Sequence, residues 1–259
     1  MKFNSIEEYY NKFNENRRLK SRHGQVEFNI SMRYLLKYLN QYEKPRIIDI
    51  GAGTGKYSIE LEKMGFDVVA VELVKHNLEV LHASNPKIKA VQANALNLSM
   101  FESETFDIAI LFGPMYHLFE FKDKLKALQE AKRITKKGGL IFVAYCLNDY
   151  SIITYAFIEN HIKEVISEGK LTTNFITNTN IEDLYSYDTL DTINKLKDIV
   201  KLKREIIFSP DGPTDYIRRT VNNMDGETFK IYLNYIETIS AKPELIGAGS
   251  HIVDVLKKE

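Results

Sequence analysis

The sequence predicts an α/β fold in which helices cover both faces of a mostly parallel sheet. Between residues 45 and 145, short apolar segments alternate with segments of helical periodicity. The apolar segments are hydrophobic almost throughout, as strands buried on both faces are. A glycine-rich turn connects the first of these segments to the helix that follows it. Together these observations favour a parallel sheet with a ligand site at its edge.

The elements of this sheet follow one another with short connections. Strands are predicted at 47–50, 67–72, 88–92, 106–112 and 140–145, with helices at 56–64, 75–83 and 121–134. Before them, two helices are expected at 5–14 and 26–39. After residue 145, the pattern predicts helices at 149–166 and 189–200, a sixth strand at 202–208, a helical excursion and a seventh strand at 251–256.

This pattern divides the chain into an N-terminal helical arm, 1–44, and one α/β domain, 45–259, with helical insertions at about 149–200 and 209–245. Because the insertions follow strand ends on the ligand side, we expect them to roof the cleft as a substrate lid. Two alternatives stay open: a dimer surface, which would make the protein a homodimer, and a simple enlargement of the core.

Composition restricts the classes of partner. Lys plus Arg and Asp plus Glu are both 35, so no global field attracts a polyanion, and nucleic acid is disfavoured. Cys146 is the only cysteine, which excludes an internal disulfide and a cysteine-rich zinc site and suits a reducing cytoplasm. The acidic start, MKFNSIEEYY, is not expected to be a signal peptide, and the chain has no long apolar run for a membrane.

Metal chemistry is not expected either. The histidines at 76, 82, 161 and 251 have no partners at the spacing that metal ligands require.

The glycine turn comes directly after the first strand. Gly51, Gly53 and Gly55 occupy every second position, and Asp49 lies two residues before the first of them. Glycine allows a ligand to approach the backbone, and the start of the following helix exposes N–H groups. The spacing differs from the dinucleotide pattern G-x-G-x-x-G, because position 56 is a lysine. A tight strand–helix junction without a ligand is the alternative.

An acid followed at this spacing by G-x-G-x-G resembles the first motif of class I S-adenosylmethionine-dependent methyltransferases. The resemblance covers roughly residues 45–145, and the flanking parts look like those of an uncharacterised bacterial group of small-molecule methyltransferases. It implies a Rossmann-like fold, with a seven-stranded, mostly parallel sheet and an antiparallel last strand. It also implies S-adenosylmethionine as cofactor and S-adenosylhomocysteine as product.

The resemblance further implies which residues bind the cofactor. Glu72 ends the second strand, where an acid can accept both ribose hydroxyls, and Leu73 would pack on the adenine. Asn94 stands where the family usually has an acid that bonds the adenine amino group, and the Ala95 N–H would donate to the ring. Glu72 as a helix cap and Asn94 as a plain turn residue are the alternatives. The expected set is Asp49, Gly51, Ala52, Gly53, Gly55, Glu72, Leu73, Asn94, Ala95, Phe112 and Gly113.

The fourth strand ends in the sequence FGPMYH, residues 112–117. Base-methylating relatives carry a polar residue, two prolines and an aromatic residue here, whereas this chain has Gly113 and Met115 at two of those positions. We therefore transfer only the location, facing the transferable methyl group. His117, with Tyr116, is the catalytic candidate, as a general base. Alternatively His117 is a structural residue of the loop. An in-line displacement can proceed by positioning alone, so a base is not required.

The polar segment before residue 26 holds the candidates for binding the substrate. Arg18, Arg22 and His23 would contact an anionic group of the acceptor, and Tyr10 would supply an aromatic wall. The alternative is a solvated connection between two helices.

These observations favour an enzyme that methylates a small molecule at N, O or S. Two alternatives stay open: an RNA, DNA or protein methyltransferase, which the balanced charge and the incomplete fourth-strand motif oppose, and a regulatory protein that binds the cofactor without catalysis.

Overall fold

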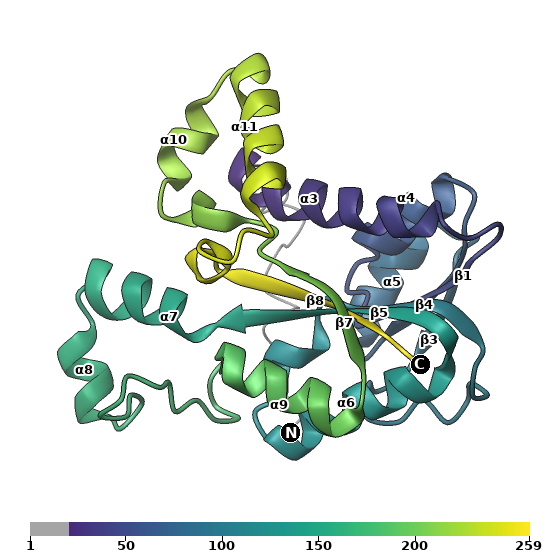
Figure 1. Cartoon of the computed structure of the whole chain (residues 1–259), viewed down its shortest axis with the longest axis horizontal. Helices are drawn as coiled ribbons and strands as arrows, with labels where there is room; N and C mark the ends of the chain where they lie inside the picture. The colour runs from purple at the N-terminus through teal and green to yellow at the C-terminus, as the bar shows by residue number, and fades with distance from the viewer. Residues whose placement is uncertain (1–20) are drawn as a thin grey trace.

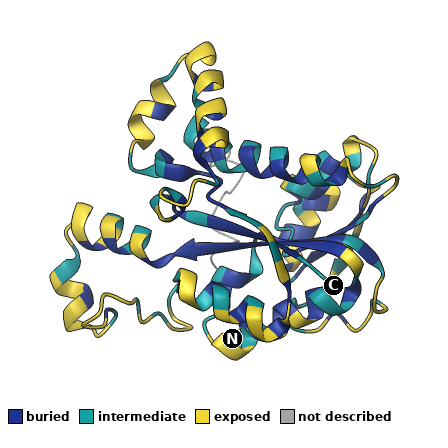
Figure 2. Cartoon of the chain, in the orientation of Figure 1, coloured by how far each residue is buried: buried dark blue, intermediate teal, exposed yellow. Residues whose placement is uncertain are grey.

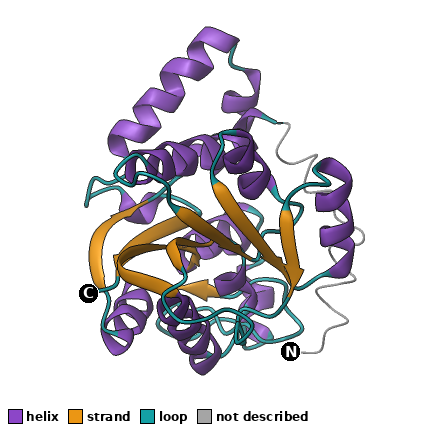
Figure 3. Cartoon of the chain, turned by 90° about the vertical axis from the view of Figure 1, so that its right-hand side faces the viewer, coloured by secondary structure: helices purple, strands orange, loops and turns teal. Residues whose placement is uncertain are grey.

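The computed structural model describes residues 21–259, which form a twisted sheet with helices on both faces (Figures 1 and 3). The strand order is β3-β2-β1-β4-β5-β8-β7, and the two-residue strand β6 pairs with β5. The strands are β1 (Arg46–Ile50), β2 (Asp67–Glu72), β3 (Lys89–Gln92), β4 (Phe106–Leu111), β5 (Thr135–Leu147), β6 (Tyr187–Asp188), β7 (Lys203–Phe208) and β8 (His251–Lys257). Strands β1 to β5 are mutually parallel, whereas β8 lies antiparallel between β5 and β7.

The predicted α/β fold and its antiparallel last strand are therefore confirmed. Within residues 21–259 the sheet has eight strands where seven were predicted. The additional strand is β6, which the sequence pattern does not predict and which pairs with the last two residues of β5. Strand β5 begins at Thr135, five residues earlier than expected, and its pairing with β4 contains a register shift between Phe106 and Ile108.

Alternating side chains of the strands build two cores. Ile47 faces the core under α3 (Arg22–Leu39), α4 (Lys56–Lys63) and α11 (Gly226–Ile239). Ile48 faces the core under α6 (Phe121–Ile134) and α9 (Leu190–Val200). Figure 2 shows the strands buried and the outer turns of the helices exposed. The α-helices are α3 (Arg22–Leu39), α4 (Lys56–Lys63), α5 (Lys75–Ser84), α6 (Phe121–Ile134), α7 (Asn148–Ser151), α8 (Ile162–Ser167), α9 (Leu190–Val200), α10 (Arg218–Asn223) and α11 (Gly226–Ile239).

Helix α3 begins four residues earlier than the apolar pattern predicts. Ser21 caps it, because its hydroxyl accepts a hydrogen bond from the Gly24 N–H at 3.4 Å. The polar residues Arg22 and His23 thus form the first helical turn and not a connection. The helix expected at 5–14 lies outside the described residues.

The first insertion departs most from prediction. In place of one helix over 149–166, α7 runs into the π-helix η2 (Ile152–Ile158), and α8 follows after a break. The Glu159 N–H donates to the Thr154 carbonyl at 2.9 Å, the wider spacing of a π-helix. Asn160 then adopts a left-handed conformation, with φ of 63°, which ends the helix. Apolar periodicity near 3.6 residues does not distinguish these forms.

The two insertions extend from the sheet in different directions (Figure 1). The first, with α7 and α8, returns along 184–188 to pair with β5. The second holds α10 and α11 and packs against α3, where the Tyr34 hydroxyl meets the Ser240 hydroxyl at 2.9 Å. Along residues 21–259, we find no helix of the length and apolarity that crossing a bilayer would require.

A buried ion pair anchors the returning segment of the first insertion. The Lys124 ammonium group on α6 donates to the Asp188 carboxylate and, at 2.8 Å, to the Ser186 hydroxyl. The Lys124 and Asp188 side chains are only 3% and 4% exposed. Since removal of one partner leaves the other charge buried without compensation, this pair is costly to break.

We expect Lys124→Ala to lower the free energy of unfolding by about 3–5 kcal/mol, because it leaves Asp188 buried without its cation. Urea denaturation followed by circular dichroism measures this change. Lys122→Ala on the exposed side of the same helix is the control and should cost little. Equal stability of the two variants would contradict an anchoring role for the pair.

Candidate functional site

The turn after β1 is shaped by glycine. Gly51, Gly53 and Gly55 all have positive φ, at 76°, 57° and 85°. A Cβ on Gly51 would lie 2.7 Å from the Pro114 Cδ, and a Cβ on Gly113 would lie 2.8 Å from the Gly51 carbonyl oxygen. The turn after β1 and the loop after β4 therefore touch backbone to backbone, and side chains at these positions would push them apart.

The Glu72 carboxylate joins this turn to the end of β2. Its Oε2 accepts from the Gly53 N–H at 2.8 Å. Its Oε1 accepts from the Val74 N–H at 2.8 Å and from the Asn77 amide at 3.3 Å. Burial raises the pKa of Glu72, although these hydrogen bonds act in the opposite direction. Glu72 thus holds the turn in place and is a buried acid beside Gly53.

Asp49 is a second buried acid beside the turn. It lies on β1, only 2% exposed, and its Oδ2 accepts from the Ser58 hydroxyl at 2.5 Å. Burial raises its pKa to about 6; the Ser58 hydrogen bond opposes this shift and the charge of Glu72 adds to it. Two carboxylates held close together in a site of low polarity favour a ligand that brings positive charge.

One pocket, which we call the turn pocket, brings these features together. Of the residues expected to bind the cofactor, all except Gly55 line it. Gly55 lies at the start of α4, where a Cβ would meet the Leu81 side chain at 2.7 Å, so its role is in packing. The predicted residues in the lining are Asp49, Gly51, Ala52, Gly53, Glu72, Leu73, Asn94, Ala95, Phe112, Gly113, Tyr116 and His117.

Asn94 lines the pocket and also forms a turn. Its side-chain oxygen accepts from the Leu96 N–H at 2.9 Å, and its carbonyl accepts from the Asn97 N–H at 2.9 Å. The turn that sequence reasoning treated as an alternative is therefore present, and it presents Ala95 to the same pocket.

The loop after β4 forms the 3-10 helix η1 (Pro114–His117) at the far side of the pocket. The Tyr116 hydroxyl donates to the Phe112 carbonyl at 2.6 Å. His117 is 8% exposed, and its Nδ1 lies 3.1 Å from the Leu184 carbonyl oxygen. Since a carbonyl only accepts, Nδ1 carries the proton and Nε2 the lone pair. Burial lowers the pKa of His117 to about 4, although the Leu184 contact opposes this shift.

The candidate substrate residues of the arm lie elsewhere. Arg22 places its guanidinium 5.7 Å from the centre of the Phe229 ring, and the His23 N–H donates to the Asn222 side chain at 3.0 Å. Both residues thus contact the second insertion and do not line the turn pocket. Tyr10 and Arg18 lie outside the described residues.

Helices α3 and α4 supply lining residues that the sequence did not single out. Phe28 and Tyr57 lie 5.0 Å apart between ring centres, and Tyr57 lies 4.9 Å from Phe112. The Lys56 ammonium group lies 4.5 Å from the centre of the Phe28 ring, and Glu27 lines the same pocket. The sequence predicts only a helix over 26–39, which contains Phe28, and assigns this residue no role in a site. One turn of the N-terminal arm therefore forms a wall of the pocket.

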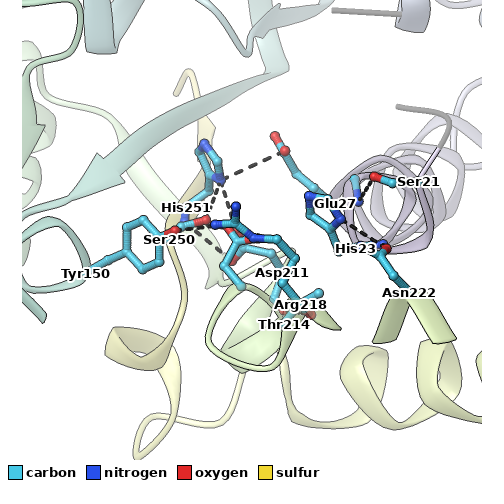
Figure 4. A network of polar contacts seen from close by, with 12 residues as sticks. Ser21, His23, Glu27, Tyr150, Asp211, Thr214, Arg218, Asn222, Ser250 and His251 are labelled. Atoms are coloured by element: carbon cyan, nitrogen blue, oxygen red, sulfur yellow. Dashed lines mark hydrogen bonds and ion pairs between the residues drawn. The ribbon is translucent and has the colours of Figure 1, made fainter. Parts of the chain in front are cut away.

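A polar network adjoins this wall (Figure 4). His251 on β8 places Nδ1 2.8 Å from the Asp211 carboxylate and 3.9 Å from that of Glu27. Its ring also lies 6.3 Å from that of Tyr116. Burial tends to lower the pKa of His251, but Glu27, Cys146 and Asp211 together hold it well above its usual value. His251 is thus a cation that ties α3 and the second insertion to the sheet.

Sequence reasoning missed this network, since its members are far apart in the chain and none forms a motif. Among residues 21–259, no group of three or more His, Cys, Asp or Glu side chains is arranged to hold a metal ion.

Comparisons with known proteins agree with this geometry. Residues 48–143 match the family model described as a methyltransferase domain. An uncharacterised methyltransferase of Mycobacterium tuberculosis is 32% identical over 104 residues, 40% of this chain and 41% of that protein. The glycine/sarcosine N-methyltransferase of Aphanothece halophytica is 28% identical over 42% of this chain and 43% of its own length. The demethylmenaquinone methyltransferase of Renibacterium salmoninarum is 36% identical over 38% of this chain and 40% of its own length.

These matches span about two fifths of the length of the curated relatives. Solved structures are similar over nearly the whole chain but show the fold alone. A methyltransferase from Methanosarcina mazei, described as S-adenosylmethionine-dependent, has a TM-score of 0.59 at 15% identity and covers 87% of this chain and 96% of its own. A possible histamine N-methyltransferase from Thermotoga maritima has a TM-score of 0.59 at 16% identity, and the match covers 97% of this chain and 98% of that one.

The raised pKa of Asp49 gives a pH-dependent stability. The folded protein retains this proton up to about pH 6, whereas the unfolded chain releases it near pH 4, so stability falls as pH rises between these values. Asp49→Asn removes the buried charge, and we expect it to gain about 1–3 kcal/mol relative to the unmodified protein at pH 8 and much less at pH 4.5. Urea denaturation at the two pH values measures this. Asp191→Asn, at an exposed position, is the control; an equal effect of Asp49→Asn at both pH values would contradict the assignment.

Proposed function

We propose that this chain, whose residues 48–143 form the methyltransferase domain of a class I S-adenosylmethionine-dependent fold, transfers a methyl group from S-adenosylmethionine to a small molecule. The acceptor atom is N, O or S. The observation that carries this proposal is the hydrogen bond from the Gly53 N–H to the Glu72 carboxylate, in a pocket that both residues line together with Asp49.

The chemistry of the turn pocket fits the methyl donor. S-adenosylmethionine carries a sulfonium and an ammonium group, and their positive charges compensate the buried carboxylates of Asp49 and Glu72. Glycine at 53 leaves the backbone open to the donor, whereas glycine at 51 permits the close contact with Pro114. The Glu72 carboxylate has about four acceptor positions, and Gly53, Val74 and Asn77 use three of them, so Oε2 keeps one position that can accept from a ribose hydroxyl. Leu73 and Ala95 would flank the adenine. Asn94 forms the turn that leads from β3 to Ala95.

The reaction needs alignment more than proton transfer. Attack on the methyl carbon forms a bond to the acceptor as the sulfur–carbon bond breaks, with its electron pair left on sulfur. Holding the three atoms in line supplies much of the acceleration. With a pKa of about 4, His117 is unprotonated at neutral pH but is a weak base. We therefore assign its Nε2 the role of a hydrogen-bond acceptor that orients the nucleophile, with Tyr116 as the neighbouring wall.

A small acceptor is supported by the walls of the pocket. Phe28, Tyr57, Phe112 and Tyr116 line it with aromatic surface, and α3 contributes Phe28 and Glu27 to this lining. Relatives of the domain include proteins named for glycine or sarcosine and for demethylmenaquinone. In this proposal residues 21–44 and the two insertions are accessory parts that surround a donor-binding domain.

Gly53→Val tests the donor site. The branched side chain would occupy the place of the donor, so we expect S-adenosylhomocysteine binding to be lost in a calorimetric titration. Gly65→Val is a matched control, because Gly65 also has positive φ, at 92°, but a side chain there meets nothing within 4 Å. The control shares the backbone strain and should keep the affinity. Glu72→Gln should weaken binding by about 1–3 kcal/mol. Unchanged affinity in Gly53→Val would refute the donor site.

Turnover requires a separate experiment. The purified protein is incubated with methyl-labelled S-adenosylmethionine and a metabolite extract from which macromolecules have been removed, and label is followed by chromatography. Transfer to a component of low molecular mass is expected. Label that moves only when RNA, DNA or protein is restored would reject the small acceptor, and binding without any transfer would favour a non-catalytic protein.

A further inference from the structure

A second cavity lies beneath the first insertion, and we call it the insertion cavity. Its volume is about 420 Å³, within the range of small-molecule sites. The π-helix η2 forms one wall, and the segment that returns toward β6 forms the opposite one. In Figure 1 this part of the chain extends beyond the end of β5, beside α7 and α8.

The insertion cavity shares a wall with the turn pocket. Tyr185 lines the insertion cavity, and its ring lies 5.8 Å from that of Tyr116 and 5.5 Å from that of His117. The neighbouring backbone is bonded to the same loop, because the Ser186 N–H donates to the Tyr116 carbonyl at 2.8 Å and the Leu184 carbonyl accepts from His117. The Tyr185 ring on one side and the Tyr116 and His117 rings on the other therefore separate the insertion cavity from the turn pocket.

This wall is fixed to the body of the fold. The Ser186 hydroxyl accepts from the buried Lys124 ammonium group, which also contacts Asp188. The shared wall is thus a built part of the domain and not the tip of a surface loop.

The lining of the insertion cavity indicates the chemistry of its occupant. Four tyrosines, at 150, 155, 185 and 187, supply flat aromatic surface and hydroxyl groups, among aliphatic side chains. Lys170 and Asp183 are the charged side chains of the lining, and they pair with each other at 3.1 Å. Burial raises the pKa of Tyr187, so that hydroxyl is neutral at physiological pH. The lining therefore suits an uncharged aromatic molecule with hydrogen-bonding groups.

The π-helix supports the same assignment. The π-helix η2 spans seven residues; π-helices are rare and occur frequently at functional sites. Here Ile152, Thr154, Tyr155 and Ala156 all lie on the cavity wall. The wider helix thus borders the cavity along much of its length.

We propose that the insertion cavity binds an uncharged phenolic molecule as a second ligand site, packed against the Tyr185 side of the shared wall. This goes beyond the proposed function, because the ligand lies outside the turn pocket.

A fluorescent probe, 2-naphthol, tests the cavity in the full chain saturated with S-adenosylhomocysteine. We expect it to bind, and 2-naphthoate, which has the same rings with a negative charge, to bind at least tenfold more weakly. Thr179 lines the cavity, so Thr179→Phe should fill it and lower 2-naphthol affinity at least tenfold. Thr173→Phe is the matched control, because Thr173 is exposed on the same loop and outside the lining. Both variants should keep wild-type affinity for S-adenosylhomocysteine and wild-type circular dichroism.

The two proposals fail in different ways. If S-adenosylhomocysteine binds but 2-naphthol does not, or binds Thr179→Phe as tightly as the unmodified protein, the cavity assignment is overturned and the proposed function is unaffected. If S-adenosylhomocysteine does not bind the unmodified protein, the proposed function fails. Preference for 2-naphthoate over 2-naphthol would also overturn the assignment.

Discussion

The close contact between the turn after β1 and the loop after β4 is the constraint on which the site depends. Gly51 and Gly113 bring the two backbones together where any Cβ would collide. The contact lies at the edge of the sheet where the parallel strands end, and Glu72 at the end of the neighbouring strand holds the turn by its hydrogen bond to Gly53. The pocket is thus a consequence of backbone packing, and the side chains around it only adjust its chemistry.

Burial then determines which groups carry charge. Asp49 and Glu72 are held in a site where burial disfavours their ionised forms, so a cationic ligand would stabilise their charges. His117 is kept neutral by the same effect, whereas His251 stays protonated because carboxylates face it. Two histidines about one pocket therefore have opposite charge states, set by their neighbours and not by the residue type.

Local patterns predicted the central sheet well, because β1, β2 and β4 are mostly apolar, buried segments bounded by turns. They also located the turn pocket, since Gly51, Gly53 and Glu72 form a motif with fixed spacing. Asn94 shows the limit of such prediction. The sequence offered a turn residue and a ligand-binding residue as alternatives, whereas Asn94 both forms the turn and lines the pocket. The π-helix was missed because its apolar side chains fit ordinary helical periodicity.

Contacts between distant segments could not be predicted at all. Glu27 and His251 meet only because α3 packs beside the second insertion and β8 enters the sheet between two earlier strands. Neither residue stands in a recognisable pattern, and the cavity under the first insertion likewise requires the return of the chain to β5. Such sites depend on tertiary packing, which apolar periodicity does not encode.

The central position of β8 has a consequence for folding on the ribosome. Strands β1 to β5 and their helices can pair as they emerge, because each neighbours a strand close in sequence. The edge of β5 must then stay unpaired until His251–Lys257 has been synthesised, and β7 cannot join the sheet before that moment. The nascent chain therefore carries an open sheet edge through the synthesis of both insertions, and the ionic contact of His251 with Glu27 is among the last to form.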